Sequence, residues 1–175
     1  MLNVKKIKVK KKIQDKIENL LLNDYFDWYY NPSTSYDALH ENMPDTFQFT
    51  HTFINDETKK QSGALPYVLE LFNEFKLGKY KKFDRIKANF TTNNIKMKGH
   101  QHIHYDYPRK GMKSLLYYVN DSDGDTIFFD NKKNEIGRVK PKRGLGLLFD
   151  SNIYHAGCNP VNSDKRIVIN FIYYD

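Results

Sequence analysis

Residues 113–129 read KSLLYYVNDSDGDTIFF, and this stretch decides the fold. It holds two runs rich in apolar and aromatic residues, 113–120 and 125–129, each of strand length and of the composition that strands favour. Between them lies Asn-Asp-Ser-Asp-Gly. Side chains of Asn, Asp and Ser bond to nearby backbone, and glycine accepts positive φ, so this segment predicts a turn. The stretch therefore predicts two consecutive strands.

The same alternation of short apolar runs and turn residues extends from about residue 83 to the C-terminus. Further turn signals occur at Asp130-Asn131, Lys142-Arg143-Gly144 and Asn162-Ser163-Asp164. The expected strands span residues 83–91, 100–106, 113–120, 125–129, 135–141, 145–150, 152–155 and 165–174. Such a series of short strands is typical of a β-sandwich or jelly roll.

The residues before this region predict two helices and one strand. Residues 14–24 and 66–76 carry apolar side chains at helical spacing, and Pro66 suits a first helical turn. Residues 46–54 alternate as in a strand, and residues 33–45 are polar and loop-like. We expect one domain over residues 1–175, in which residues 1–82 support a catalytic jelly-roll core of residues 83–175. The fold class is mainly β with flanking helices.

Composition limits the class of protein. Of the 175 residues, 39% are hydrophobic and 15% aromatic, which favours a folded chain over a disordered one. No apolar run is long enough to cross a bilayer, and the basic first residues lack the features of a secretory signal. A single cysteine, Cys158, excludes an internal disulfide and suits a reducing compartment. We expect a cytoplasmic protein without membrane contact.

The net charge of +7 arises mainly at the N-terminus. Six of these charges come from Lys5, Lys6, Lys8, Lys10, Lys11 and Lys12. The rest of the chain is nearly neutral, so nothing indicates a basic face elsewhere. We therefore favour a solvated tail over a nucleic-acid-binding arm.

Two histidines and one aspartate form a candidate metal site. His104 and Asp106 are two positions apart, so in a strand their side chains lie on the same face. The third ligand must come from an adjacent strand, and His155 is the only histidine after His104. Two histidines and one carboxylate are the facial triad of non-haem Fe(II), whereas calcium prefers oxygen ligands and structural zinc prefers cysteines.

The other histidines are weaker candidates. His102 is the main alternative ligand, because it shares the expected face of His104, and is otherwise a pocket or surface residue. For His100, His51 and His40 we expect structural or exposed positions.

A cation is expected near the metal. Arg166 lies in the last expected strand, and a guanidinium inside a barrel is costly to bury unless a carboxylate pairs with it. A dicarboxylate co-substrate would be such a partner, and a structural ion pair is the alternative. Lys165 falls on the opposite face by strand parity. Of Tyr117 and Tyr118, one must point inward, where its hydroxyl could donate to the same carboxylate.

From Arg85 to Tyr174, the chain resembles the prolyl 4-hydroxylase branch of the Fe(II)- and 2-oxoglutarate-dependent dioxygenases. The resemblance rests on the order and spacing of RIKANFTT, HIHYDY, SLLYYVND, GDTIFF, VKPKRGLGLLFD, NIYHAG and KRIVINFIYY. It implies a double-stranded β-helix (jelly roll) core. It implies Fe(II), 2-oxoglutarate and O2 as cofactor and co-substrates.

The resemblance also implies residue roles. The iron ligands would be His104, Asp106 and His155. Arg166 would pair with the distal carboxylate of 2-oxoglutarate, and Tyr118 would hydrogen-bond that carboxylate. Because Asp106 is present, hydroxylation is favoured over halogenation.

The expected function is hydroxylation of a substrate with release of succinate and CO2. The family suggests a prolyl or other side chain of a peptide or protein as the substrate. Other interpretations are a dioxygenase acting on a free amino acid or nucleobase, or a non-catalytic jelly-roll module that binds nucleic acid through its N-terminal lysines. The oligomeric state does not follow from the sequence.

Overall fold

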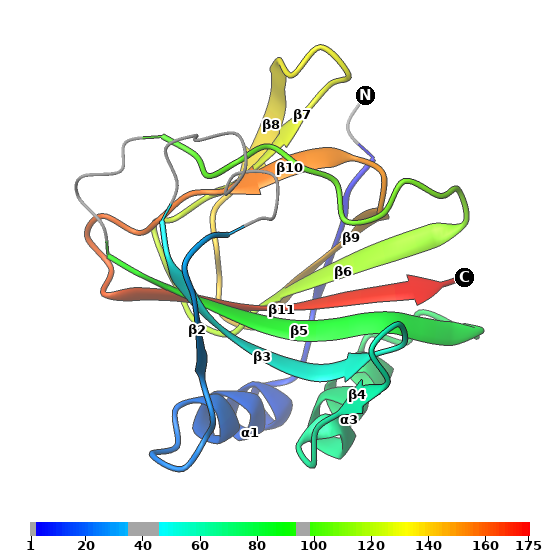
Figure 1. Ribbon diagram of the computed structural model, residues 1–175, viewed down its shortest axis with the longest axis vertical. Coiled ribbons are helices and arrows are strands. Elements are labelled where there is room, and N and C mark those ends of the chain that lie inside the picture. The colour runs from blue at the N-terminus through cyan, green and yellow to red at the C-terminus, as the bar shows by residue number, and fades with distance from the viewer. Residues whose placement is uncertain (1–2, 35–45, 94–98) are drawn as a thin grey trace.

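The computed structural model describes residues 3–34, 46–93 and 99–175. Within these residues the strands form two antiparallel sheets that face each other (Figure 1). The larger sheet contains, in spatial order, β1 (Lys5–Lys8), β9 (Leu145–Asp150), β6 (Met112–Tyr118), β11 (Lys165–Tyr174), β5 (Lys82–Thr92), β3 (Gln48–Asn55) and β2 (Tyr29–Asn31), with β4 (Lys60–Gln61) paired to β3. The smaller sheet contains β10 (Tyr154–Gly157), β7 (Thr126–Phe129) and β8 (Glu135–Val139).

This arrangement is a double-stranded β-helix, the jelly roll expected from the sequence. The stretch 113–129 supplies β6 to the large sheet and β7 to the small one, so its turn carries the chain from one sheet to the other. The central strand pairs β11–β5 and β11–β6 run antiparallel, with Arg166 opposite Thr91 and Asn170 opposite both Lys87 and Leu116.

The two helices among the described residues pack on the outer face of the large sheet. In α1 (Lys11–Leu21), Ile13, Ile17 and Leu21 recur every four residues and are buried. In α3 (Leu65–Glu74), Pro66 lies in the first turn, and Val68 and Phe72 are buried. Neither helix is long and apolar enough to cross a membrane, within the residues described.

The central strands β6 and β11 of the large sheet are buried on both faces, because helices cover one and the small sheet covers the other. The helix side forms one hydrophobic cluster that includes Leu115, Tyr117, Ile169 and Phe171. The inner side forms a second cluster of Leu116, Tyr118, Phe128, Val139, Leu147, Phe149 and Val168. Strand alternation thus sends consecutive residues of β6 and β11 into two different cores.

Two expectations about local structure were wrong. Residues 100–106 are not a strand: they make only isolated bridges, between His100 and Cys158 and between His104 and His155. Regular pairing ends there, because the amides of Asp106 and Tyr107 both donate to the Ser151 carbonyl. The small sheet also continues past the expected strand 152–155, since β10 begins at Tyr154 and ends at Gly157.

The N-terminal lysines do not form a free tail. Lys5–Lys8 pair with β9 at the edge of the large sheet, and Lys11 and Lys12 begin α1. Val9 and Ile13 are buried, so these two apolar side chains hold the basic segment against the rest of the protein. The lysine side chains themselves remain exposed. The expected loop 33–45 lies mostly outside the described residues.

Candidate metal and co-substrate site

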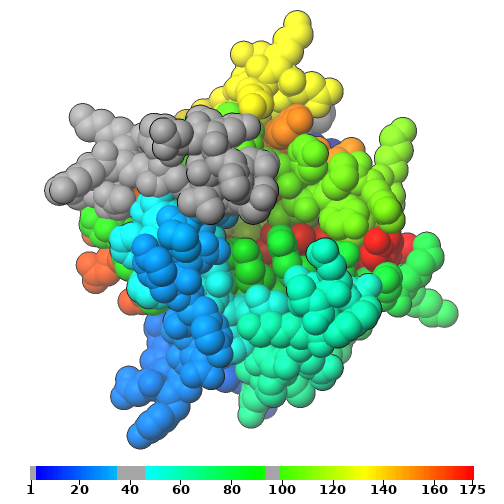
Figure 2. Space-filling model, in the orientation of Figure 1, coloured from blue at the N-terminus to red at the C-terminus, as the bar shows by residue number. Residues whose placement is uncertain are grey.

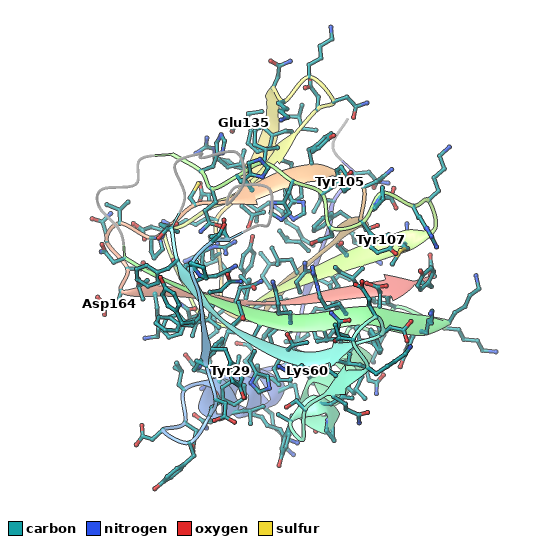
Figure 3. All side chains as sticks on the ribbon, in the orientation of Figure 1. Tyr29, Lys60, Tyr105, Tyr107, Glu135 and Asp164 are labelled. Carbon is teal, nitrogen blue, oxygen red and sulfur yellow. The ribbon has the colours of Figure 1, made fainter. Side chains whose placement is uncertain are left out.

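A polar cavity of about 420 Å³ lies between the two sheets. Its wall includes alternate residues of β5 and of β11, and residues of β7 and β10 close the other side. In Figure 2, atoms of β11, in red, are set back behind those of β5 and of the segment before β6. Tyr105, labelled in Figure 3, lines the cavity, is 42% exposed and packs against Tyr154 of β10.

The structure brings His104, Asp106 and His155 together in this cavity. One potential ligand atom from each lies within 4.8 Å of the other two. The backbones of His104 and His155 are joined by two hydrogen bonds, of 2.8 and 3.0 Å, between their amides and carbonyls. This bridge places the two imidazoles side by side, with ring centroids 4.6 Å apart.

Both imidazoles are oriented in the same way. The His104 Nδ1 lies 3.0 Å from the His102 carbonyl oxygen, and the His155 Nδ1 lies 3.0 Å from that of Ile153. A carbonyl only accepts, so each Nδ1 carries a proton, and Nε2 is the ring nitrogen available to a metal. Burial, with the neighbouring His155, lowers the pKa of His104 to about 4, so this ring is neutral at physiological pH.

The Asp106 carboxylate is held by side chains of β6 and β11 in the large sheet. Its Oδ2 accepts a hydrogen bond from the Ser114 hydroxyl at 2.6 Å, and its Oδ1 accepts one from the Asn170 amide at 2.8 Å. Its side chain is only 2% exposed. Burial opposes ionisation, but the two imidazoles, Arg85 and the Ser114 hydroxyl together lower the pKa of Asp106. The group is therefore a carboxylate.

These three groups fit a ferrous ion. Two imidazole nitrogens and one carboxylate oxygen, converging from one side of a cavity, are the donor set of the facial triad. The carbonyls behind each imidazole and the two donors behind Asp106 fix ligand orientation, as the supporting hydrogen bonds of metal sites do.

Arg166 lies further along the same wall. It is 5% exposed, its Nε donates to the Gly124 carbonyl and its Nη2 donates to the Thr126 hydroxyl, both at 2.8 Å. Neither acceptor is an acid, and no ion pair of Arg166 occurs among the described residues. Burial lowers the pKa of Arg166, although a guanidinium remains charged. A buried cation without an acidic partner fits an anionic co-substrate.

Tyr118 points inward and Tyr117 points toward the helices. The Tyr118 ring lies beneath Arg166, with the guanidinium carbon 5.8 Å from the ring centroid. Its hydroxyl donates to Thr126 Oγ1 at 2.7 Å. Tyr117 instead packs against Phe75. Thr126 thus lies between Tyr118 and the cavity, and sequence reasoning missed it.

Two further cations line the cavity, Arg85 and Lys87. Burial, with the charge of Arg85, lowers the pKa of Lys87 to about 8. The alternation of Arg85, Lys87, Asn89 and Thr91 along β5 was a signal that sequence reasoning did not use. Ser114 and Asn170 were also missed as partners of Asp106.

The remaining candidates do not reach the cavity. His102 is buried outside its lining and contributes its carbonyl to His104. His100 packs on Phe129, and His51 is hydrogen-bonded to the Asp27 carbonyl and to Ser62. Lys165 lies on the other face of β11, as expected, and His40 lies outside the described residues.

Comparison with known proteins agrees with this geometry. Residues 90–174 match the family model of the 2OG-Fe(II) oxygenase superfamily. No curated protein sequence matches the chain.

Solved structures share the fold at low sequence identity. A Trichoplax adhaerens prolyl hydroxylase in complex with a peptide fragment of hypoxia-inducible factor is 16% identical, with a TM-score of 0.66 over 98% of this chain and 83% of that one. A Pseudomonas putida prolyl-4-hydroxylase is 14% identical, with a TM-score of 0.63 over 98% and 91%. HygX from Streptomyces hygroscopicus, with nickel, 2-oxoglutarate and hygromycin B bound, is 9% identical, with a TM-score of 0.62 over 98% and 82%.

Proposed function

We propose that this chain, a 2OG-Fe(II) oxygenase by its family match over residues 90–174, uses His104, Asp106 and His155 to hold iron and Arg166 to anchor 2-oxoglutarate. The observation that carries the proposal is the convergence of three ligand atoms within 4.8 Å beside a buried arginine that has no acidic partner in the described chain.

The cofactor supplies the oxidation. With Fe(II), 2-oxoglutarate and O2 bound, such a site couples oxidative decarboxylation of 2-oxoglutarate, to succinate and CO2, with insertion of one oxygen atom into a substrate C–H bond. The protein supplies ligand orientation, anchoring of the co-substrate and exclusion of water.

Each residue has a distinct part in this work. His104 and His155 would present Nε2 to the metal, while each Nδ1–H donates to a backbone carbonyl. Asp106 would ligate as a carboxylate whose orientation Ser114 and Asn170 fix. Arg166 would orient 2-oxoglutarate, with its guanidinium held by Gly124 and Thr126.

The substrate we propose is a prolyl or other side chain of a peptide or protein. Structures with this fold include a prolyl hydroxylase with a bound peptide fragment and a prolyl-4-hydroxylase. A small molecule is the second candidate, since the same fold occurs with hygromycin B bound. The N-terminal lysines do not line the cavity, which disfavours a nucleic-acid substrate.

Anaerobic titration tests the iron and co-substrate assignments. Fe(II) followed by 2-oxoglutarate should produce a metal-to-ligand charge-transfer band in the visible region. Replacing His155 with alanine should abolish the band and 2-oxoglutarate turnover. The control is His51→Ala, which removes a buried histidine outside the cavity; the folded fraction of this variant should keep the band. Turnover retained after His155→Ala would refute the ligand assignment.

Succinate release then tests the substrate. A panel of proline-containing peptides and of free amino acids, each added to the iron-loaded enzyme in air, should include peptides that raise succinate formation. Stimulation by free amino acids alone would overturn the peptide proposal without affecting the iron site.

A further inference from the structure

The cavity wall carries more positive charge than iron and 2-oxoglutarate require. Among the described lining residues, the cations are Arg85, Lys87 and Arg166, and the one carboxylate is Asp106. A ferrous ion and the 2-oxoglutarate dianion cancel each other, and Asp106 offsets one of the three cations. The loaded site then keeps two positive charges in excess.

Arg85 and Lys87 lie away from the expected co-substrate anchor. On β5, Thr91 is opposite Arg166, whereas Lys87 is opposite Asn170 and Arg85 is opposite Ile172. At about 3.3 Å per residue, the backbone of Lys87 lies about 13 Å from that of Thr91, and that of Arg85 about 20 Å. A single 2-oxoglutarate, with one carboxylate at Arg166 and the other toward the metal, leaves Arg85 and Lys87 without an anion.

The described protein supplies only one distant partner. The Arg85 Nη2 lies 3.8 Å from Asp106 Oδ1, an ion pair too long for a hydrogen bond, and this oxygen accepts the Asn170 amide at 2.8 Å. The Arg85 Nε is buried without a hydrogen-bond partner, and so is the Oδ1 of Asn89, four residues further along β5. Within the described residues Lys87 has no ion pair or hydrogen bond, only longer-range interactions with Arg85 and Asp106. Neighbouring like charges without a counter-ion are costly in a confined cavity.

We propose, building on the function proposed above, that Arg85 and Lys87 form a subsite for a carboxylate of the substrate. The substrate is then an acidic molecule whose oxidised carbon lies a short distance from this carboxylate, because Arg85 also borders the metal ligand Asp106. Arginine recognises a carboxylate with two parallel hydrogen bonds, and the lysine ammonium adds a third donor. An acidic side chain of a peptide and the carboxylate of a free amino acid share this chemistry.

The first test uses acetate, the carboxylate alone. Protein loaded anaerobically with Fe(II) and saturating 2-oxoglutarate, which keeps Arg166 occupied, is titrated with acetate by calorimetry at constant ionic strength. We expect millimolar binding that weakens at least tenfold in Arg85→Gln and in Lys87→Met. The matched control is Lys82→Met, which removes an exposed lysine from the same strand outside the cavity and should leave binding unchanged.

The possible outcomes distinguish failure of the carboxylate subsite from failure of the proposed oxygenase function. A normal charge-transfer band with no acetate binding, or with binding equal in wild type, Arg85→Gln and Lys87→Met, overturns the subsite alone. Failure of the band in the wild type overturns the proposed function and the subsite together. The band also shows that each variant has folded and loaded.

Turnover then identifies the source of the carboxylate. Proline-containing peptides with Asp or Glu are compared with their Asn or Gln counterparts and with free amino acids, by succinate release. Stimulation by acidic peptides that is lost in Arg85→Gln assigns a peptide substrate, and the same pattern with amino acids assigns a small molecule. Equal stimulation by acidic and neutral peptides, unchanged in Arg85→Gln, contradicts the proposal.

Discussion

The side-chain amide of Asn170 donates a hydrogen bond of 2.8 Å to Oδ1 of Asp106. Asn170 lies in the middle of β11, and Asp106 lies in the irregular segment after the His104 bridge. With the Ser114 hydroxyl on the other oxygen, this bond ties the carboxylate to two central strands of the large sheet. The position of Asp106 is therefore set by the sheet rather than by its own segment.

Replacing Asn170 with alanine should weaken Fe(II) binding. Loss of a group that orients a metal ligand typically costs about 10- to 100-fold in affinity, and loss of the bond should lower stability by about 1 kcal/mol. Anaerobic metal titration measures the first effect and denaturant unfolding the second. Asn131→Ala, an exposed turn residue, is the control. Unchanged affinity in Asn170→Ala would show that Asp106 does not depend on this bond.

Thr126 should matter more than Tyr118 for 2-oxoglutarate binding. The Thr126 hydroxyl accepts hydrogen bonds from both Arg166 and Tyr118, so its own proton is left for the cavity. Thr126→Val removes an acceptor from Arg166 and a donor from the cavity, whereas Tyr118→Phe leaves Thr126 in place. We expect the 2-oxoglutarate dissociation constant to rise about tenfold in Thr126→Val, which is a loss of about 1.4 kcal/mol of binding free energy. The rise should be smaller in Tyr118→Phe.

The charge-transfer band, titrated with 2-oxoglutarate, measures this difference. A larger loss in Tyr118→Phe than in Thr126→Val would mean that Tyr118 bonds the co-substrate directly, as the family resemblance implies.

Gly124 should not tolerate a side chain. A Cβ at this position would lie 2.4 Å from the Cys158 carbonyl oxygen and 3.0 Å from the Arg166 Cδ. Because the first contact is with backbone, Gly124→Ala should shift the segment after β10 and with it the Arg166 side chain. We expect a lower melting temperature and weaker 2-oxoglutarate binding. Gly63→Ala, where a Cβ meets open space, should change neither. Wild-type melting and binding in Gly124→Ala would contradict this packing.

The metal-free protein should lose stability as the pH falls below neutrality. The pKa of His104 is about 4 in the folded protein, against an ordinary value of 6.5. Between these values the unfolded chain binds a proton at this residue and the folded chain does not, so unfolding becomes easier as pH falls. The His104 contribution amounts to about 3 kcal/mol across this range and is absent above pH 6.5.

Denaturant unfolding of metal-free protein between pH 7 and pH 4 measures this dependence, with His104→Gln as the matched variant. The wild type should lose more stability on acidification than His104→Gln does. Parallel curves for the two proteins would show that His104 is not held neutral.

Local patterns in the sequence predicted most of the secondary structure. Short apolar runs bounded by turn residues located β5, β6, β7, β8, β9 and β11, because strands buried on both faces carry apolar residues almost continuously. Helical spacing located α1 and α3. Strand alternation put Arg166 and Asn170 on one face of β11 and Lys165 on the other.

What the sequence by itself determined was this set of strands and helices, the inward face of β11 and the spacing of His104, Asp106, His155 and Arg166. Only the tertiary structure decided that residues 100–106 form isolated bridges, that the N-terminal lysines join β1 and α1, and that Thr126, Ser114, Asn170, Arg85 and Lys87 surround the site. The physical reason is that alternation fixes which face a side chain occupies, whereas its neighbours depend on the register between strands that are distant in the sequence. That register brings β5, β6, β7 and β11 around one cavity, and no connecting turn fixes it between strands as distant in the sequence as β5 and β11.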